Sequence, residues 1–428
     1  KALKSLKQYF LGAWVAILTI TIVVLFVLMI ELSATSKGHT EKLDVMGGNV
    51  PSGSVNAPVA TVPPSADASY TVPAYWQDAV NEAADKVQGL LDEAGRDAVV
   101  FAWFSDVHYD LNAKNTATGA ITAAVMDKCN ISYAISTGDM LTQSVLGSEE
   151  AVVKAYEAAY KMLSPIGSDR LLQVEGNHDG SWGVIDLDGN GKIEDGEHYK
   201  FNMTDEKIYN YMFRQHSGDS RRVYGDEGTW FYIDDTASKT RYIMLCDVWS
   251  EHTVNEINGA AVYNQMGDYG FGQSQLTWLA NEALSFTEGG WDVVIAAHVP
   301  ISQDSFRDGD VARGILDAFE NGTSYKGTSG EKGTWQYVDI SVDFSRSHTG
   351  EIIGFFSGHV HRDSIYAELP YPVVTITSNV NTSYDEREEK REYGTDNEVA
   401  VDFVVVNKRT NEVNIVRLGV GSDRNYKY

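Results

Sequence analysis

The sequence predicts an α/β protein whose strands are buried, preceded by a segment that spans a membrane. Three observations support this fold class. Short apolar runs alternate with stretches of helical periodicity over most of the chain, which is typical of a sheet covered by helices. A run of 21 residues near the start carries no charge. The 428 residues are 43% hydrophobic and 22% charged, which is the composition of a globular protein rather than a disordered one.

The apolar run covers residues 10–30 and follows a tail, residues 1–9, that contains three lysines and no acid. At about 1.5 Å per residue it matches the hydrocarbon core of a bilayer, roughly 30 Å thick. A cleaved signal peptide is the main alternative, but its apolar region is usually about 7–15 residues long and ends at small residues, whereas Leu32 is large. We therefore expect a single-pass protein of the cell membrane, with a cytoplasmic N-terminus and an extracytoplasmic main domain. Self-association of this helix in a filament or oligomer is a further possibility.

Residues 31–73 are predicted to form an extended linker. Five of the nine prolines lie between positions 44 and 73, among Gly, Ser and Ala and with two charges. Such a composition favours a solvated spacer over a packed element. The remaining residues, 74–428, are expected to form one domain.

The net charge of −26 excludes a general nucleic-acid binder, because a polyanion gains no counterion release on an acidic protein. No nucleic-acid binding surface is therefore expected. The same charge argues against adsorption of the main domain to anionic lipid. The two cysteines, Cys129 and Cys246, lie in apolar surroundings and are predicted to be buried thiols rather than a disulfide.

The domain begins with a helix over 74–94, which Gly95 ends. Five apolar, strand-like runs follow, at 98–103, 131–136, 170–174, 292–297 and 351–356, and helical patterns separate several of them, at 116–128, 149–163 and 273–286. From about 335 to 417 the pattern is mostly strand-like, which suggests a second sheet or a second layer of the same core. In α/β sheets, ligands gather beyond the carboxyl ends of the strands.

Each of the five runs leads directly into a cluster of polar residues. Together these clusters supply seven candidate metal ligands: Asp106, His108, Asp139, Asn177, His298, His359 and His361. Mixed imidazole and oxygen donors suit borderline divalent metals. On extended chain, side chains at i and i+2 point the same way, so Asp-x-His and His-x-His could each reach one centre. Five such clusters at equivalent positions predict a metal site.

In these blocks the chain resembles the calcineurin-like metallophosphoesterases. That family's pattern is Asp-x-His, Gly-Asp, Gly-Asn-His-Asp/Glu, a lone His and Gly-His-x-His, and every block is present here in that order between positions 106 and 361. The resemblance covers roughly residues 97–420. It implies a sandwich of two mixed β-sheets flanked by helices, with a two-metal centre at its edge.

The resemblance also implies roles for the individual residues. Asp106, His108 and His361 would hold the first metal, whereas Asn177, His298 and His359 would hold the second. Asp139 would bridge both metals, and His178 would face the substrate instead of binding metal. The cofactors would be two divalent transition metals, Mn, Fe or Zn. The substrate would be a small phosphate ester, either a monoester or a diester.

One departure from the family concerns the residue that orients His178. In the protein-phosphatase branch a second Asp follows the Gly-Asp block, and Thr142 occupies that place here. This leaves open whether Asp179 or another residue orients His178, or whether the ring is less polarised. We do not expect a protein Ser/Thr phosphatase for this reason.

Residues 186–197, DLDGNGKIEDGE, resemble the calcium loop of an EF-hand. We expect a Ca²⁺ site in which side chains, one carbonyl and one bridging water supply oxygen. Asp186, Asp188, Asn190 and Glu197 would bind by side chain, Lys192 by its carbonyl and Glu194 through water. The residues before the loop are not helical in pattern and no paired loop is visible, so an acidic surface turn is the alternative.

The sequence thus predicts a membrane-anchored, extracytoplasmic phosphoesterase with two metals, in which metal-activated water attacks the phosphate ester. Two alternatives remain. In one, the protein serves surface display or assembly, its N-terminal helix oligomerises and its phosphatase-like domain mainly binds. In the other, the same centre catalyses a different metallohydrolase reaction.

Overall fold

The computed structural model describes residues 70–109, 115–142, 148–184, 199–255, 260–263, 265–303, 306–346, 350–380 and 390–428. The predicted tail, the apolar segment 10–30, nearly all of the linker and the calcium loop 186–197 lie outside these residues. Within the described part of the chain, no helix is both long enough and apolar enough to cross a membrane.

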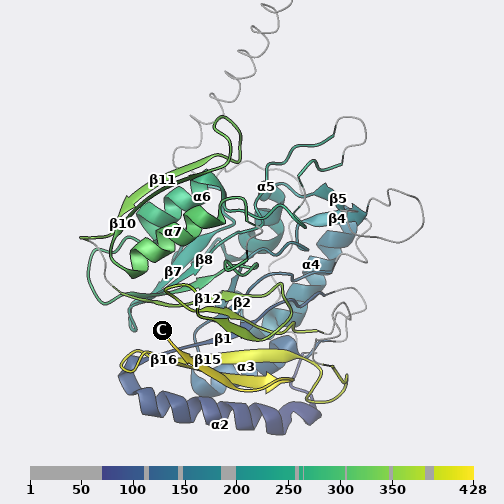
Figure 1. The fold of residues 1–428 in the computed structure, drawn as a ribbon. Coiled ribbons are helices and arrows are strands. Elements are labelled where there is room, and N and C mark those ends of the chain that lie inside the picture. Colours follow the sequence, from purple (N-terminus) through teal and green to yellow (C-terminus); the bar gives the residue numbers. More distant parts are fainter. Residues whose placement is uncertain are drawn as a thin grey trace, which may run out of the picture. The chain divides into compact units, whose positions relative to one another are not determined.

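The first of two large sheets contains the first and the last strand of the domain. Its strands, in spatial order, are β17 (Arg424–Lys427), β16 (Glu412–Gly419), β15 (Ala400–Asn407), β1 (Ala98–Phe104), β2 (Ala134–Ser136) and β3 (Leu171–Gln173). Of these, β1, β2, β15 and β16 are labelled in Figure 1. The strands β1, β2 and β3 are parallel, whereas β15 pairs antiparallel with β1. The sheet is therefore mixed.

The second large sheet is also mixed. Its spatial order is β13 (Ser364–Tyr366), β14 (Val373–Thr375), β12 (Ile352–Ser357), β9 (Asp292–Ala296), β8 (Thr240–Met244), β7 (Phe231–Asp235) and β6 (Arg222–Tyr224). The four strands β14, β12, β9 and β8 run parallel to one another, and the strands at the two edges are antiparallel to their neighbours.

The two sheets pack against each other through aromatic side chains. Phe101 of β1 lies edge-on to Phe356 of β12 and to Tyr242 of β8, with ring centroids 5.2 Å and 5.8 Å apart. Trp103 of β1 meets Phe356 at 5.0 Å. All four of these rings are buried. The prediction of an α/β fold with two mixed sheets is confirmed.

The expectation that residues 335–417 form a second sheet or a second layer of the same core holds for only part of this segment. The strands β12, β13 and β14 lie in the second sheet, but β15 and β16 belong to the first. The physical reason is that β1 has an edge left unpaired by β2. Residues 402–407 pair along almost the whole of β1 and satisfy its backbone groups.

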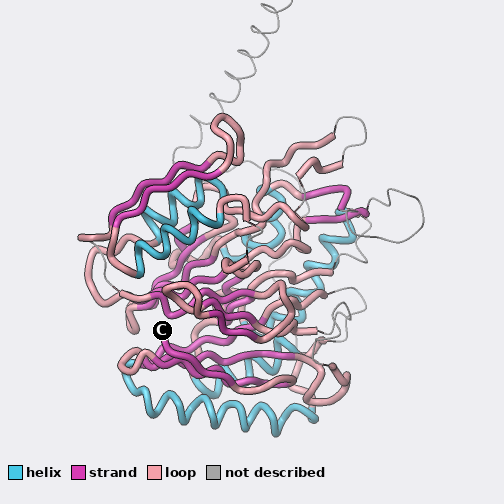
Figure 2. Tube along the Cα trace, in the orientation of Figure 1, coloured by secondary structure: helices cyan, strands magenta, loops and turns pink. Residues whose placement is uncertain are grey.

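Helices cover the outer faces of both sheets (Figure 2). A short turn, η1 (Ala74–Trp76), leads into α2 (Gln77–Ala94), which packs on β15 and β16 and ends at Gly95, where φ is 63°. The helices α3 (Thr118–Cys129) and α4 (Glu149–Leu163) contribute to the same core. On the second sheet lie α6 (Gly272–Trp278), η7 (Leu279–Ala283) and α7 (Gly309–Glu320), with the hairpin β10 (Ser324–Ser329) and β11 (Val338–Asp343) outside them.

The remaining elements are short. They are η2 (Gly95–Asp97), η4 (Ser164–Ile166), β4 (Ser181–Val184), β5 (Tyr199–Asn202), α5 (Asp205–Ile208), η5 (Tyr209–Phe213) and η6 (Arg214–His216). Cys129 and Cys246 are buried free thiols, as predicted.

The parallel strands determine where the polar clusters lie. The clusters after β1, β2 and β3 leave the first sheet at one edge, because these strands are parallel. The clusters after β9 and β12 leave the second sheet in the same way. The candidate site is therefore built at a junction of two sheets.

Candidate metal centre

The chain leaves the strands in an unusual backbone conformation. Five of the seven predicted ligands have a positive φ: 53° at Asp106, 44° at His108, 50° at Asp139, 65° at His359 and 53° at His361. Non-glycine residues rarely adopt this left-handed region, although Asp, Asn and His are enriched in it. The expectation of extended chain at these positions was wrong. The side chains of each pair nevertheless reach one place, because the chain curls at both of its members.

Backbone hydrogen bonds hold these curled segments together. The Asp106 N–H donates to the Gly138 carbonyl and the His108 N–H to the Asp139 carbonyl, each at 3.0 Å. The His359 N–H points at the Asp106 carboxylate, 3.1 Å and 3.2 Å from its two oxygens. The clusters after β1, β2 and β12 are thus cross-linked by main-chain groups.

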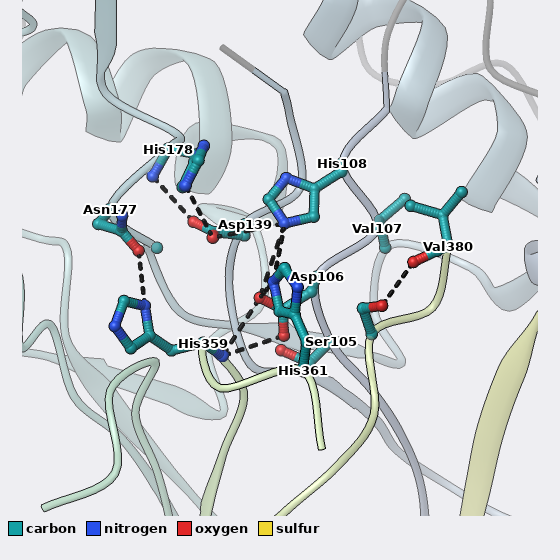
Figure 3. A network of polar contacts seen from close by, with 12 residues as sticks. Ser105, Asp106, Val107, His108, Asp139, Asn177, His178, His359, His361 and Val380 are labelled. Atoms are coloured by element: carbon teal, nitrogen blue, oxygen red, sulfur yellow. Dashed lines mark hydrogen bonds and ion pairs between the residues drawn. The ribbon is translucent and has the colours of Figure 1, made fainter. Parts of the chain in front are cut away.

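A first group of donor atoms comes from Asp106, His108, Asp139 and His361, and these atoms all lie within 4.8 Å of one another. Figure 3 shows their side chains converging. The His361 Nε2 lies 3.1 Å from Asp106 Oδ1 and 3.2 Å from His108 Nε2. These are the residues that the family resemblance assigns to the first metal and to the bridge, and they could hold one ion.

A second group forms around Asn177. Its Oδ1 lies 2.8 Å from His298 Nε2 and 3.1 Å from His359 Nδ1. The Asp139 Oδ2 is 3.2 Å from His298 Nε2 on this side and 3.8 Å from His108 Nε2 on the other. Asp139 therefore lies between the two groups. All seven predicted ligand residues are brought together, in two groups that share one carboxylate.

The electrostatics of the site favour bound cations. Asp106 and Asp139 are at most 1% exposed, and in the described part of the chain their ion-pair partners are histidines, never Lys or Arg. Burial would raise the pKa of Asp106, but the adjoining His361 outweighs it and the pKa falls to about 2. Buried carboxylates that stay ionised need positive charge beside them. Imidazole, carboxylate and amide oxygen donors fit borderline divalent metals.

The pKa of His298 also indicates that the site favours positive charge. Its Nδ1 lies 2.8 Å from the Thr137 carbonyl, to which it donates, so Nε2 is the ring nitrogen that faces the centre. Burial lowers the pKa of this ring, yet Asp139 more than compensates and the pKa rises to about 10. Asp247 supports the segment from behind, since its carboxylate accepts from the N–H groups of His298 and Val299 at 3.3 Å and 2.7 Å.

His178 lies beside the two groups rather than within them (Figure 3). Its N–H donates to Asp139 Oδ1 at 2.8 Å, and its ring stands against His108, with centroids 4.9 Å apart. The ring Nδ1 is buried without a hydrogen-bond partner in the described residues. Burial lowers the pKa of His178 to about 3 despite the opposing effect of Asp139, so the ring is neutral at pH 7.

Asp179 does not take the orienting role left open by Thr142. Its carboxylate accepts from the Leu141 N–H at 3.1 Å and from the Gly176 N–H at 2.8 Å. Both oxygens are thus occupied by main-chain donors. Asp179 instead ties the segment after β3 to the segment after β2, the two segments that carry Asn177 and Asp139.

Sequence reasoning missed one polar group that supports the centre. The Asn379 N–H donates to the Ser105 carbonyl at 2.8 Å, and Asn379 Oδ1 accepts from Thr118 Oγ1 at 2.8 Å. Asn115 bonds both to Asn379 Oδ1 at 3.2 Å and to the Val107 carbonyl at 2.9 Å. A signal was available: Asn379 ends a polar cluster that directly follows an apolar run at β14, as the predicted ligands do at five other strands.

Two glycines permit the close approach of these segments. A Cβ on Gly358 would lie 1.9 Å from Ser105 Oγ and 2.3 Å from Asp106 Oδ2. A Cβ on Gly176 would lie 2.2 Å from the Asp139 nitrogen. In both cases the obstacle is part of the site, so no side chain fits without moving a candidate ligand.

Comparisons with known proteins give distant similarities. No protein-family model matches the sequence, and no curated protein sequence matches it. A dimetal phosphatase from Danio rerio is similar in structure, with 11% identity over 77% of this chain and 98% of that chain and a TM-score of 0.46. GAP50, the anchor in the inner membrane complex of Plasmodium, is 12% identical over 77% of this chain and 88% of that chain, with a TM-score of 0.40. The phosphopantetheinyl hydrolase of Mycobacterium tuberculosis is 9% identical over 65% of this chain and 89% of that chain, with a TM-score of 0.28.

Substituting Gly358 should damage metal binding specifically. In Gly358→Ala the new methyl group displaces Asp106, so we expect affinity for Mn²⁺ to fall at least about tenfold, as for changes that misorient metal ligands. Gly289→Ala is the matched control, because nothing lies within 4 Å of a Cβ there. Isothermal titration calorimetry measures both. Wild-type affinity in Gly358→Ala would contradict the geometry described here.

Proposed function

We propose that this chain is a phosphoesterase that uses two divalent transition metals, Mn, Fe or Zn. The observation that carries the proposal is the position of Asp139. Its Oδ2 lies 3.2 Å from a histidine of one donor group and 3.8 Å from a histidine of the other. A shared carboxylate is the feature that distinguishes a two-metal centre from two separate metal sites.

Two metals held by these donor groups would supply an activated water and neutralise the phosphoryl oxygens during in-line displacement. The chain's own residues supply the rest. Asp139 fixes the separation of the two donor groups. His178 is held beside Asp139 through its N–H, and its neutral ring has a nitrogen without a partner. That ring would donate a hydrogen bond to a phosphoryl or leaving-group oxygen.

The substrate class follows from the same residues. A small phosphomonoester or phosphodiester offers the oxygens that two metals and one imidazole bind. The occupied carboxylate of Asp179 and the presence of Thr142 leave His178 without the acidic partner of the protein-phosphatase branch, which disfavours a phosphoprotein substrate. The reaction would be hydrolysis by attack of water.

Turnover of model esters tests the proposal. With Mn²⁺, Zn²⁺ or Fe²⁺, we expect hydrolysis of p-nitrophenyl phosphate or its bis ester, and no hydrolysis by Asp139→Asn. In His178→Asn we expect kcat to fall by about 10²- to 10³-fold, the usual range for loss of one hydrogen-bond donor to the developing charge. Metal binding by His178→Asn should stay at the wild-type level, because His178 lies outside both donor groups.

Two results would contradict the proposal. One is the absence of turnover of either ester with any of these metals. The other is full activity in Asp139→Asn, because the amide would then serve as well as the shared carboxylate.

From the sequence alone we further propose that residues 10–30 anchor the protein in the cell membrane, with the catalytic domain outside the cytoplasm, and that residues 186–197 bind Ca²⁺. Deletion of residues 1–30 should release the protein from the membrane fraction. Ca²⁺ should raise the melting temperature of the wild type but not of Asp186→Ala. If the protein without residues 1–30 stays in the membrane fraction, the anchor is refuted. If Ca²⁺ raises the melting temperatures of the wild type and of Asp186→Ala equally, the calcium site is refuted.

A further inference from the structure

The loop formed by residues 265–270, here called the Met266 loop, lies against the second donor group. The Asn177 Nδ2 donates to the Met266 Sδ at 3.0 Å. The ring of Tyr269 meets the ring of His359 nearly edge-on, with centroids 5.4 Å apart and an interplanar angle of 78°. Two of the three side chains that belong to the second group alone therefore contact this one loop.

The contact with Met266 determines which end of the Asn177 amide faces the centre. Its Oδ1 lies between two imidazole nitrogens, so a flipped amide would present N–H donors where a metal needs an oxygen. In the described residues, the Nδ2 has Met266 as its hydrogen-bond partner. A thioether is a weak acceptor, so this contact holds the amide less firmly than a carbonyl would. The ligand orientation of Asn177 therefore depends on where the loop places one sulfur.

The loop itself is fixed to the protein by polar side chains. Gln265 Nε2 donates to Glu175 Oε1 at 2.8 Å, and both residues are buried. Arg307 Nη1 donates to the Asp268 carbonyl at 2.7 Å. The Tyr269 hydroxyl donates to the Met266 carbonyl at 2.6 Å, which couples the two contacting residues to each other. The loop is thus a preformed support.

Two members of the first donor group, Asp106 and His108, are supported in a different way. Asp106 and His108 donate their backbone N–H groups to carbonyls of Gly138 and Asp139, in the segment after β2. These bonds join strand ends of the first sheet, to which the Met266 loop does not belong. A change in the loop should therefore affect one metal and spare the other.

We propose that Met266 and Tyr269 are positioning residues that set the affinity of the second metal, the one held by Asn177, His298 and His359, independently of the first. The inference rests on the proposed two-metal function. Replacement of an outer partner of a metal ligand typically lowers metal affinity by about 10- to 100-fold. Met266→Leu keeps the volume and removes the acceptor, so the second site should weaken by that factor.

Calorimetric titration of the full chain with Mn²⁺ tests the proposal without reference to turnover. The wild type should bind two ions. Met266→Leu should keep one site at wild-type affinity and weaken the other by about 10- to 100-fold. Met162→Leu is the matched control, because Met162 is fully buried in α4 and should leave both sites unchanged. Thermal unfolding verifies that each variant is folded.

Tyr269 provides a second pair of variants. Tyr269→Leu removes the ring that faces His359 and should weaken the second site, whereas Tyr269→Phe keeps the ring and should weaken it less. Two wild-type sites in both Met266→Leu and Tyr269→Leu would overturn the inference while leaving the proposed function intact. Equal weakening of both sites would also overturn it. A wild type that binds fewer than two ions would overturn the inference and the proposed function together.

Discussion

The burial of Asp106 and Asp139 where the two sheets meet is the constraint on which the rest of the site depends. Ionised carboxylates removed from water need positive charge close by. In the described residues their partners are imidazoles, and burial keeps the pKa of His108 and His359 below the usual value, so these rings bring no charge at pH 7. At His298 the pKa is raised, to about 10. The simplest way to balance two buried anions here is to bind cations.

This arrangement requires a strained backbone. Five of the eight described non-glycine residues with positive φ belong to the candidate centre. Each such residue is unfavourable by about 1–3 kcal/mol and persists only where its surroundings determine it. The determining contacts are the main-chain bonds between the segments after β1, β2 and β12, the carboxylate of Asp179 and the side chain of Asn379. The strain is concentrated where donor atoms must converge, and the regular strands behind it provide the stability.

The sequence predicted the elements better than their assembly. The helix at 149–163 begins and ends as predicted, because its apolar spacing is a local feature. The strands before each polar cluster were predicted for the same reason. Membership of β15 in the first sheet was not predicted. Residues 402–407 pair with residues 98–103, and a pairing between segments so distant in the sequence leaves no local pattern. The left-handed conformation of Asp106 and His361 was missed too, since it arises from contacts between loops.

The candidate ligands were predictable because their types and order are specific, whereas their supports were not. Asn379 and Met266 act through contacts with segments that are distant in the sequence, and neither residue type predicts a site by itself. The membrane segment 10–30 and the loop 186–197 stay predictions of the sequence.

The central claim is that two metal ions share Asp139, and anomalous scattering from crystals grown with Mn²⁺ tests it most directly. The account predicts two anomalous peaks about 3.5–4 Å apart, one on each side of the Asp139 carboxylate. One peak would lie near Asp106 and His361, and the other near Asn177 and His298. A single peak, or two peaks too far apart for one carboxylate to bridge, would contradict it.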